Sequence, residues 1–195
     1  MMRKRIASLI SNILNPFLVS LAVILLLSFR SASSTLDAIK WSLILVAISI
    51  LPIFLAVTYL VRNGKLDGIF INARKQRTKI YLLAGICAGA GCVILPLLEA
   101  PLILVATFVA GLSAIIVFTV INLLWKISLH TAFVAGSITA LVIVYGSIAA
   151  VTVGLLPLIA WARTELEHHS LAQVATGAFL AALIVVLVYY PFGLV

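Results

Sequence analysis

Charged residues are scarce in this chain: only 9% of its 195 residues are Asp, Glu, Lys or Arg, whereas 65% are hydrophobic. An ordinary soluble domain has roughly 25% charged residues, so this composition excludes one. Acidic residues are fewest, with 5 Asp and Glu against 13 Lys and Arg. In a membrane protein such a basic excess indicates orientation and contact with membrane lipids, and we expect no nucleic-acid partner.

Cysteine is rare as well. Cys87 and Cys92 lie in one apolar run, and their spacing differs from that of metal-binding cysteines. The simplest interpretation is that both are small packing residues. We therefore expect no redox role, no metal site and no other cofactor.

Long apolar runs dominate the remaining sequence. A bilayer core about 30 Å thick requires about 20 helical residues, so the chain can hold about six or seven spans and has no room for a soluble domain. We predict an all-α, polytopic membrane helical bundle, with residues 1–195 forming one integral membrane domain. The predicted spans are residues 11–29, 41–61, 80–98, 102–124, 128–146, 148–162 and 171–190. The sixth is the shortest and has the length of a re-entrant segment.

Short features refine this layout. Basic residues near the N-terminus resemble the start of a secretory signal, but the apolar run is long and Ser31-Ala-Ser33 is a poor cleavage site, which favours an uncleaved anchor. Glu99-Ala-Pro101 and Gly146-Ser147 predict tight turns between antiparallel spans. Gly85 and Gly89 predict a face of small residues where two helices approach closely.

The distribution of basic residues predicts the side on which each loop lies. If all seven segments cross, the N-terminus, residues 62–79, residues 125–130 and residues 163–170 share one side. All of the 13 basic residues except Arg30 and Lys40 then lie on that side. The positive-inside rule assigns this polar face to the cytoplasm.

The most informative polar stretch runs from Arg163 to Gln173, between two apolar segments, where charged groups are costly. His169 and Gln173 are four residues apart, the spacing of neighbours on one helix face, so Gln173 can orient His169. Arg163 lies six residues before His169, so a turn or helix break must bring the two together. The alternative is an interfacial loop in which Arg163 and the adjacent histidines are solvated or meet lipid headgroups.

Two further polar clusters precede apolar segments. In the first, Ser128 is a natural N-cap after Lys126, and a helix start favours a bound phosphate. His130 can protonate a departing oxygen there; alternatively, Ser128 only caps, Lys126 extends to the interface and His130 bonds a carbonyl. In the second, Arg74 and Arg77 are three residues apart, and their planar guanidinium groups suit a diphosphate. A topology signal is the alternative there.

Taken in order, the three clusters resemble the signatures K-x6-R-P, S-G-H and R-x5-H-x3-D of the type 2 phosphatidic acid phosphatase superfamily. The corresponding residues here are Arg77-Thr78, Ser128-Leu-His130 and Arg163-x5-His169-x3-Gln173, and the resemblance covers about residues 62–185. It implies a six-helix phosphatase-like core. It also implies that His169 attacks phosphorus, that His130 is the general acid, and that arginines and Ser128 hold the phosphate.

Three positions depart from the family pattern. Phe70 stands seven residues before Arg77 in place of lysine, so Arg74 or Lys126 would have to supply that contact. Leu129 replaces the glycine of the second signature and adds a side chain where the backbone approaches closely. Gln173 replaces the aspartate; it accepts a hydrogen bond but supplies no negative charge.

These observations predict a metal-independent membrane phosphatase for a lipid phosphate or isoprenoid diphosphate, acting through a phosphohistidine. The departures leave open a noncatalytic lipid-phosphate-binding protein with a degenerate site. A haem or ion-pathway protein is a third class, disfavoured because the histidines coincide with arginines instead of forming spaced ligand pairs within spans. A purely structural bundle is expected if the polar clusters do not come together.

Overall fold

The computed structural model describes residues 2–66, 68 and 74–195, apart from the side chains of residues 74 and 75, and these residues form helices and no strand. The chain divides into two compact units, Met1–Val23 with Lys126–Val195, and Ile24–Trp125. Five described helices are long and apolar enough to cross a membrane, or six if one bent helix pair is a span. The predicted all-α membrane bundle is confirmed, whereas the single domain over residues 1–195 stays a prediction.

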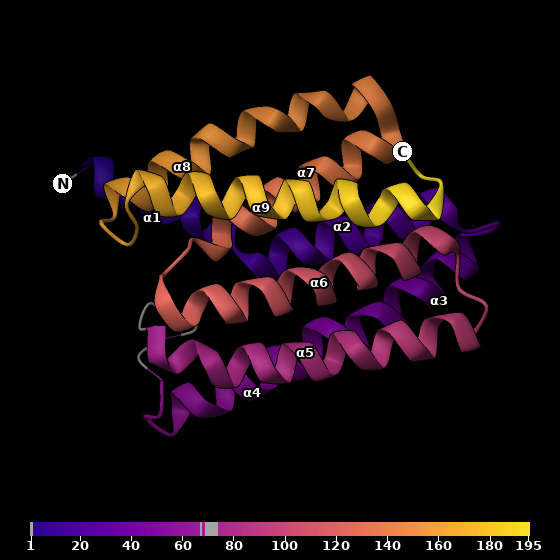
Figure 1. Ribbon diagram of the computed structural model, residues 1–195, viewed down its shortest axis with the longest axis horizontal. Helices are drawn as coiled ribbons and strands as arrows, with labels where there is room; N and C mark the ends of the chain where they lie inside the picture. Colours follow the sequence, from indigo (N-terminus) through magenta and orange to yellow (C-terminus); the bar gives the residue numbers. More distant parts are fainter. Residues whose placement is uncertain (1, 67, 69–73) are drawn as a thin grey trace. The chain divides into compact units, whose positions relative to one another are not determined.

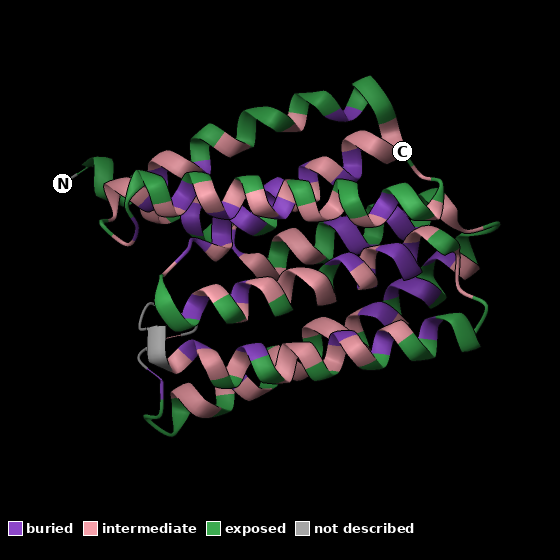
Figure 2. Cartoon of the chain, in the orientation of Figure 1, coloured by how far each residue is buried: buried purple, intermediate pink, exposed green. Residues whose placement is uncertain are grey.

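The first unit is built around α7 (Figure 1). Its elements are α1 (Met2–Ile13), the start of α2 (Pro16–Ser31), α7 (Leu129–Tyr145), η2 (Gly146–Gly154), α8 (Leu155–Glu165), α9 (Leu171–Tyr189) and η3 (Tyr190–Phe192). Helix α7 packs against both α8 and α9, and α1 packs against α8. More residues are buried on α7 than on α1, α8 or α9 (Figure 2). Ala7, Val134, Ile159 and Ala162 form a core cluster that joins α1, α7 and α8.

The helical stretch Leu129–Glu165 is a hairpin with two arms. A single helix of these 37 residues would be about 55 Å long, but α7 contacts α8, and Figure 1 shows the chain turning back between them. The turn is at Gly146, whose φ of 67° favours glycine, as predicted for Gly146-Ser147. Because η2 is a 3-10 helix with a rise of about 2 Å per residue, η2 and α8 together reach about 34 Å. Residues 146–165, which contain the sixth predicted segment, are therefore long enough to cross.

The predicted span 11–29 is interrupted by a helix break. Helices α1 and α2 are separate and meet at a bend of 42°. The Asn15 side chain accepts hydrogen bonds from the backbone N–H groups of Phe17 and Leu18, at 2.9 and 3.0 Å, so it caps a new helix. Pro16 occupies the first position of α2, where its missing N–H costs nothing. Asn-Pro therefore ends the first helix locally.

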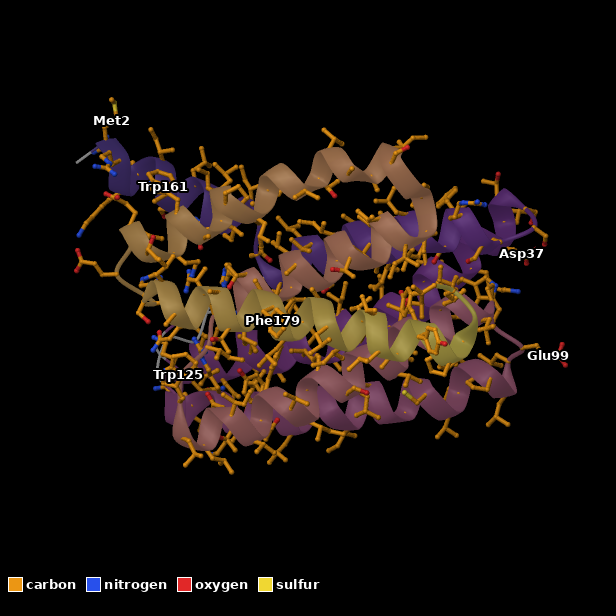
Figure 3. The ribbon with its side chains drawn as sticks, turned by 45° about the horizontal axis from the view of Figure 1, so that its top comes forward. Met2, Asp37, Glu99, Trp125, Trp161 and Phe179 are labelled. Atoms are coloured by element: carbon orange, nitrogen blue, oxygen red, sulfur yellow. The ribbon has the colours of Figure 1, made fainter. Side chains whose placement is uncertain are left out.

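The second unit holds the remainder of α2, then α3 (Thr35–Leu45), η1 (Val46–Ile50), α4 (Leu51–Arg62), α5 (Arg74–Leu97) and α6 (Leu102–Leu124). Thr35–Arg62 is one continuous apolar stretch of 28 residues. Its central turn, η1, is a π-helix that ends two residues before Pro52, which cannot donate to the preceding turn. Asp37 at the start of α3 and Glu99 after α5 lie at the same end of this unit (Figure 3).

Helices α5 and α6 form a tight hairpin. Glu99 adopts a φ of 56° in the predicted turn, and the N–H of Ala100 donates to the carbonyl of Leu95 at 3.0 Å. The prediction that Gly89 lines the close approach is wrong, because an added Cβ there meets nothing within 4 Å. Gly91 is the tight position, since an added Cβ would overlap the ring of Phe108. The choice between these glycines depends on the rotation of α5 about its axis.

Candidate functional site

The turn between α8 and α9 brings the Arg163 end of one helix to the start of the next. The N–H of Glu167 donates to the carbonyl of Thr164 at 2.9 Å, and the N–H of His168 donates to the carbonyl of Arg163 at 3.2 Å. These two bonds form a Schellman motif, with Glu167 in the left-handed region at a φ of 58°. The helix break that the spacing between Arg163 and His169 requires is therefore present.

Gln173 contacts His169 through a helix cap. Ser170 caps α9, and the Gln173 side chain accepts from the backbone N–H of Ser170 at 3.3 Å, forming a capping box. His169 Nδ1 lies 3.1 Å from the same Oε1 atom. The predicted pair is present, but the expectation that both residues lie on one helix face is wrong, because His169 precedes the cap. Their contact comes from the chain bending back at the start of α9.

This geometry determines which His169 nitrogen carries the proton. A backbone N–H can only donate, so the Gln173 atom facing Ser170 is the oxygen. An amide oxygen can only accept, so a hydrogen bond from the His169 ring to that oxygen requires a proton on Nδ1. In the neutral imidazole, Nε2 then carries the lone pair. That tautomer can attack an electrophile through Nε2.

The segment before α7 is joined to this turn. Lys126 Nζ donates to the carbonyl of His168 at 2.9 Å, and the N–H of Ser128 donates to the carbonyl of Gln173 at 3.2 Å. Gly177 makes the approach possible, because a Cβ added there would lie 2.9 Å from the Ser128 carbonyl oxygen. The cluster from Lys126 to His130 and the cluster from Arg163 to Gln173 therefore come together, and Lys126 does not simply extend to the interface.

Ser128 and His130 lie in a buried helix start. The Ser128 side chain accepts from the N–H of Thr131 at 3.5 Å, which confirms Ser128 as the N-cap of α7. Ser128 is 0% exposed and His130 is 5% exposed. The capped first turn of α7 therefore lies beside a buried histidine, and a helix start favours an anion.

Arg163 is buried at the end of α8 and is held from α1. Its exposed fraction is 3%, and its Nη1 donates to Ser11 Oγ at 2.9 Å. The alternative of a solvated interfacial loop does not fit Arg163 and His169, because His169 is also buried, at 7% exposed, whereas His168 is partly buried. Neighbouring helices cover both side chains.

The turn itself carries a mixture of charges. Lys4 donates to Glu167 at 2.8 Å, and this hydrogen bond, with the attraction of the Lys4 charge, lowers the pKa of Glu167. Burial lowers the pKa of His168, and the positive charges of Arg163 and Lys126 lower it further. His168 Nδ1 is buried with no hydrogen-bond partner among the residues that the structure describes. His168 therefore favours its neutral form, next to two cations.

The cluster that contains Arg74 and Arg77 belongs to the second unit. Arg77 is buried in the first turns of α5 at 3% exposed, and Tyr81 one turn later is buried too. The side chain of Arg74 and the position of Phe70 lie outside the described residues. The predicted contributions of Arg74 and Arg77 to a phosphate site stay predictions.

Sequence reasoning missed two residues that shape the site. Ser11 lies in the first helix, outside the stretch that resembles the phosphatase family, and no local pattern distinguishes it from other serines. Gly177 has a local signal, since it interrupts an apolar helix, but its partner Ser128 is distant in sequence. Both roles depend on which helices are neighbours.

Comparison with known proteins yields no relative. No family model, no curated protein and no solved structure matches this chain. Among the described residues, no three His, Cys, Asp or Glu side chains are grouped as metal ligands.

Proposed function

We propose that this protein is a membrane phosphatase that hydrolyses a lipid phosphate or an isoprenoid diphosphate through a phosphohistidine on His169. The observation that carries the proposal is the contact of His169 Nδ1 with Gln173 Oε1 at 3.1 Å, which leaves Nε2 as the nucleophilic nitrogen. The capped start of α7 and the cations Lys126 and Arg163 belong to the same unit and support phosphate as the bound group.

In the proposed reaction, His169 Nε2 forms a bond to phosphorus while the bond from phosphorus to the lipid oxygen breaks. His130 donates a proton to the departing oxygen. Gln173 accepts the hydrogen bond from Nδ1–H throughout. Water then attacks the phosphohistidine and loses a proton to His130, which releases inorganic phosphate and restores both histidines.

The location of the group suits an amphiphilic substrate. His169 and Ser128 lie at the ends of helices long and apolar enough to cross a membrane. A phosphate can bind there among polar groups while its hydrocarbon chain stays in the bilayer. Lipid phosphates and isoprenoid diphosphates are the substrate classes that combine both parts.

A noncatalytic lipid-phosphate-binding protein is the second candidate, and Gln173 favours it. A carboxylate at this position would stabilise a positively charged imidazole during the reaction, and the neutral amide gives only a dipole. Lys126 also uses one of its three N–H groups on the carbonyl of His168. Both features are compatible with binding and slow turnover.

The test is phosphate release by the purified protein in lipid micelles, with His169→Asn as the control for contaminating enzymes. Isoprenoid diphosphates, isoprenoid monophosphates and phosphatidic acid are compared. We expect turnover that falls by about 10³-fold or more in the variant and persists with a chelator, because loss of a nucleophile removes the covalent route. Equal rates in both proteins would reject the enzyme, and loss of activity on chelation would contradict the metal-independent mechanism.

If the protein only binds lipid phosphate, the same purified protein in micelles should give a different result. Lipid phosphate would bind without being hydrolysed, and His169→Asn would bind as well as the parent protein. Arg163→Ala would weaken binding in either case, because it removes the buried cation.

A further inference from the structure

Helix α1 lies outside the stretch that resembles the phosphatase family, yet one of its residues contacts the predicted phosphate ligand. Ser11 Oγ accepts a hydrogen bond from Arg163 Nη1 at 2.9 Å, across 152 residues of sequence. Both residues are 3% exposed. A hydrogen bond between two buried side chains restricts the rotamers of a long guanidinium chain, which otherwise has many.

The chemistry of the Ser11 hydroxyl suits a supporting role. A guanidinium group has five N–H donors and no acceptor, so one bond to a hydroxyl leaves its charge in place. A carboxylate at the same position would neutralise the cation and compete with a phosphate. Ser11 therefore orients Arg163 and keeps its positive charge.

The surrounding packing fixes the distance between α1 and α8. Ala7 on α1, and Ile159 and Ala162 on α8, are each 0% exposed in one core cluster. Trp161 packs against the same cluster, and Figure 3 shows it near the end of the unit where Met2 lies. Since these contacts are tightly packed, Ser11 cannot move away from Arg163 without opening the core.

The same helix also binds the acidic groups of the turn. Arg3 pairs with Glu165 at 3.1 Å, and Lys4 pairs with Glu167 at 2.8 Å. These carboxylates lie two and four residues after Arg163. These pairs attach the turn after Arg163 to the start of α1.

We propose that Ser11 is a positioning residue for Arg163, and that α1 is therefore a structural part of the phosphate site. This inference rests on the proposed function, since it takes Arg163 as a phosphate ligand. It gives α1 a role in the site, although the three sequence clusters all lie later in the chain.

The test is a double-mutant cycle on Ser11 and Arg163, with orthovanadate as the phosphate mimic. Binding is measured by calorimetry and inhibition, and KM and kcat are measured for a lipid phosphate. We expect Ser11→Ala to weaken vanadate binding and raise KM by about tenfold, as for a lost hydrogen bond to a charged group. Ser11→Thr retains the hydroxyl and should bind vanadate within about threefold of the parent protein.

The cycle separates positioning from a general packing defect. Ser8→Ala on the same helix is the matched control and should leave vanadate binding unchanged. If Ser11 acts through Arg163, adding Ser11→Ala to Arg163→Ala has no further effect on binding. Additive losses, or equal losses in the Ser8 and Ser11 variants, would overturn the proposal.

Failure of the proposed function gives a different result. If the parent protein and His169→Asn release phosphate equally but bind vanadate, the enzyme is rejected and the cycle still tests Ser11 by binding. If the parent protein binds no vanadate, the phosphate site and the role of Ser11 both fail. Normal turnover together with additive effects of Ser11→Ala and Arg163→Ala on vanadate binding would reject only the positioning role of Ser11.

Discussion

At the scale of single residues, adjacent histidines have different environments. His169 is buried and contacts Gln173, whereas His168 is partly buried and lies near Arg163 and Lys126. Burial and these positive charges both oppose protonation of His168, so its pKa lies below the ordinary value. The spacing to Gln173 distinguishes His169 in the sequence, but the different burial of the two rings depends on the tertiary structure.

This difference predicts an acid-sensitive fold. Because the pKa of His168 is lowered in the folded state, the unfolded chain binds the proton first as the pH falls through about 6.5. We therefore expect thermal stability in micelles to decrease between about pH 8 and about pH 5.5. Glu167 contributes in a lower window, because its lowered pKa gives stability that is lost only near about pH 4.3 and below.

His168→Gln tests the assignment. The variant keeps the backbone carbonyl that Lys126 contacts and removes the titrating ring. We expect its unfolding temperature to be less dependent on pH over the same range. An unchanged slope would assign the acid sensitivity to another group.

At the scale of elements, the contact between α7 and α9 determines how the site is assembled. Gly177 allows α9 to reach the Ser128 carbonyl, and the Ser128 N–H donates to Gln173 one turn earlier on α9. Gly136, on α7, lies in the same interface but meets only ordinary contacts with Ala181 and Val185, at 3.6 Å or more. These two glycines provide a matched pair.

Gly177→Ala should be destabilising and Gly136→Ala should not. An added methyl at Gly177 meets a backbone oxygen at 2.9 Å, so one helix must shift, at a cost of about 1–3 kcal/mol. At Gly136 the better helix propensity of alanine offsets the contact, and stability should stay within about 1 kcal/mol. Thermal unfolding and phosphate release are measured for both. Equal stability of the two variants would contradict the close approach at Ser128.

At the scale of the whole molecule, membrane orientation is a prediction from charge distribution. Within the second unit, Thr35–Arg62 is long enough to separate Asn63 at its end from Asp37 near its start. Asp37 and Glu99 lie at the same end of that unit (Figure 3). Most basic residues of this unit lie near Asn63 or at the start of α5, and the positive-inside rule predicts that this end faces the cytoplasm.

Cysteine labelling tests this orientation. In a background with Cys87 and Cys92 replaced by alanine, single cysteines are introduced at the exposed positions Asn63 and Glu99. In intact cells we expect a membrane-impermeant maleimide to label Glu99→Cys and to spare Asn63→Cys. Lysed cells provide the control for reactivity. The reverse pattern would place the polar face outside and contradict the predicted cytoplasmic site.

The sequence by itself determined the helical membrane architecture, because a backbone in lipid must satisfy its hydrogen bonds within helices and the apolar runs have the necessary lengths. It also determined local features such as the N-cap Ser128 and the turn at Glu99, since caps and turns depend on a few adjacent residues. Asn15 and Pro16 carried a local signal as well, although the predicted first span ran through them.

The tertiary structure alone decided the contacts between distant segments. It brought Ser11 to Arg163, Lys126 to the His168 carbonyl and Gly177 to Ser128. Helical periodicity indicates which residues share a face, but not which helix lies opposite or how far each is rotated. Those choices follow from the packing of whole helix surfaces, because close packing tolerates neither voids nor overlaps.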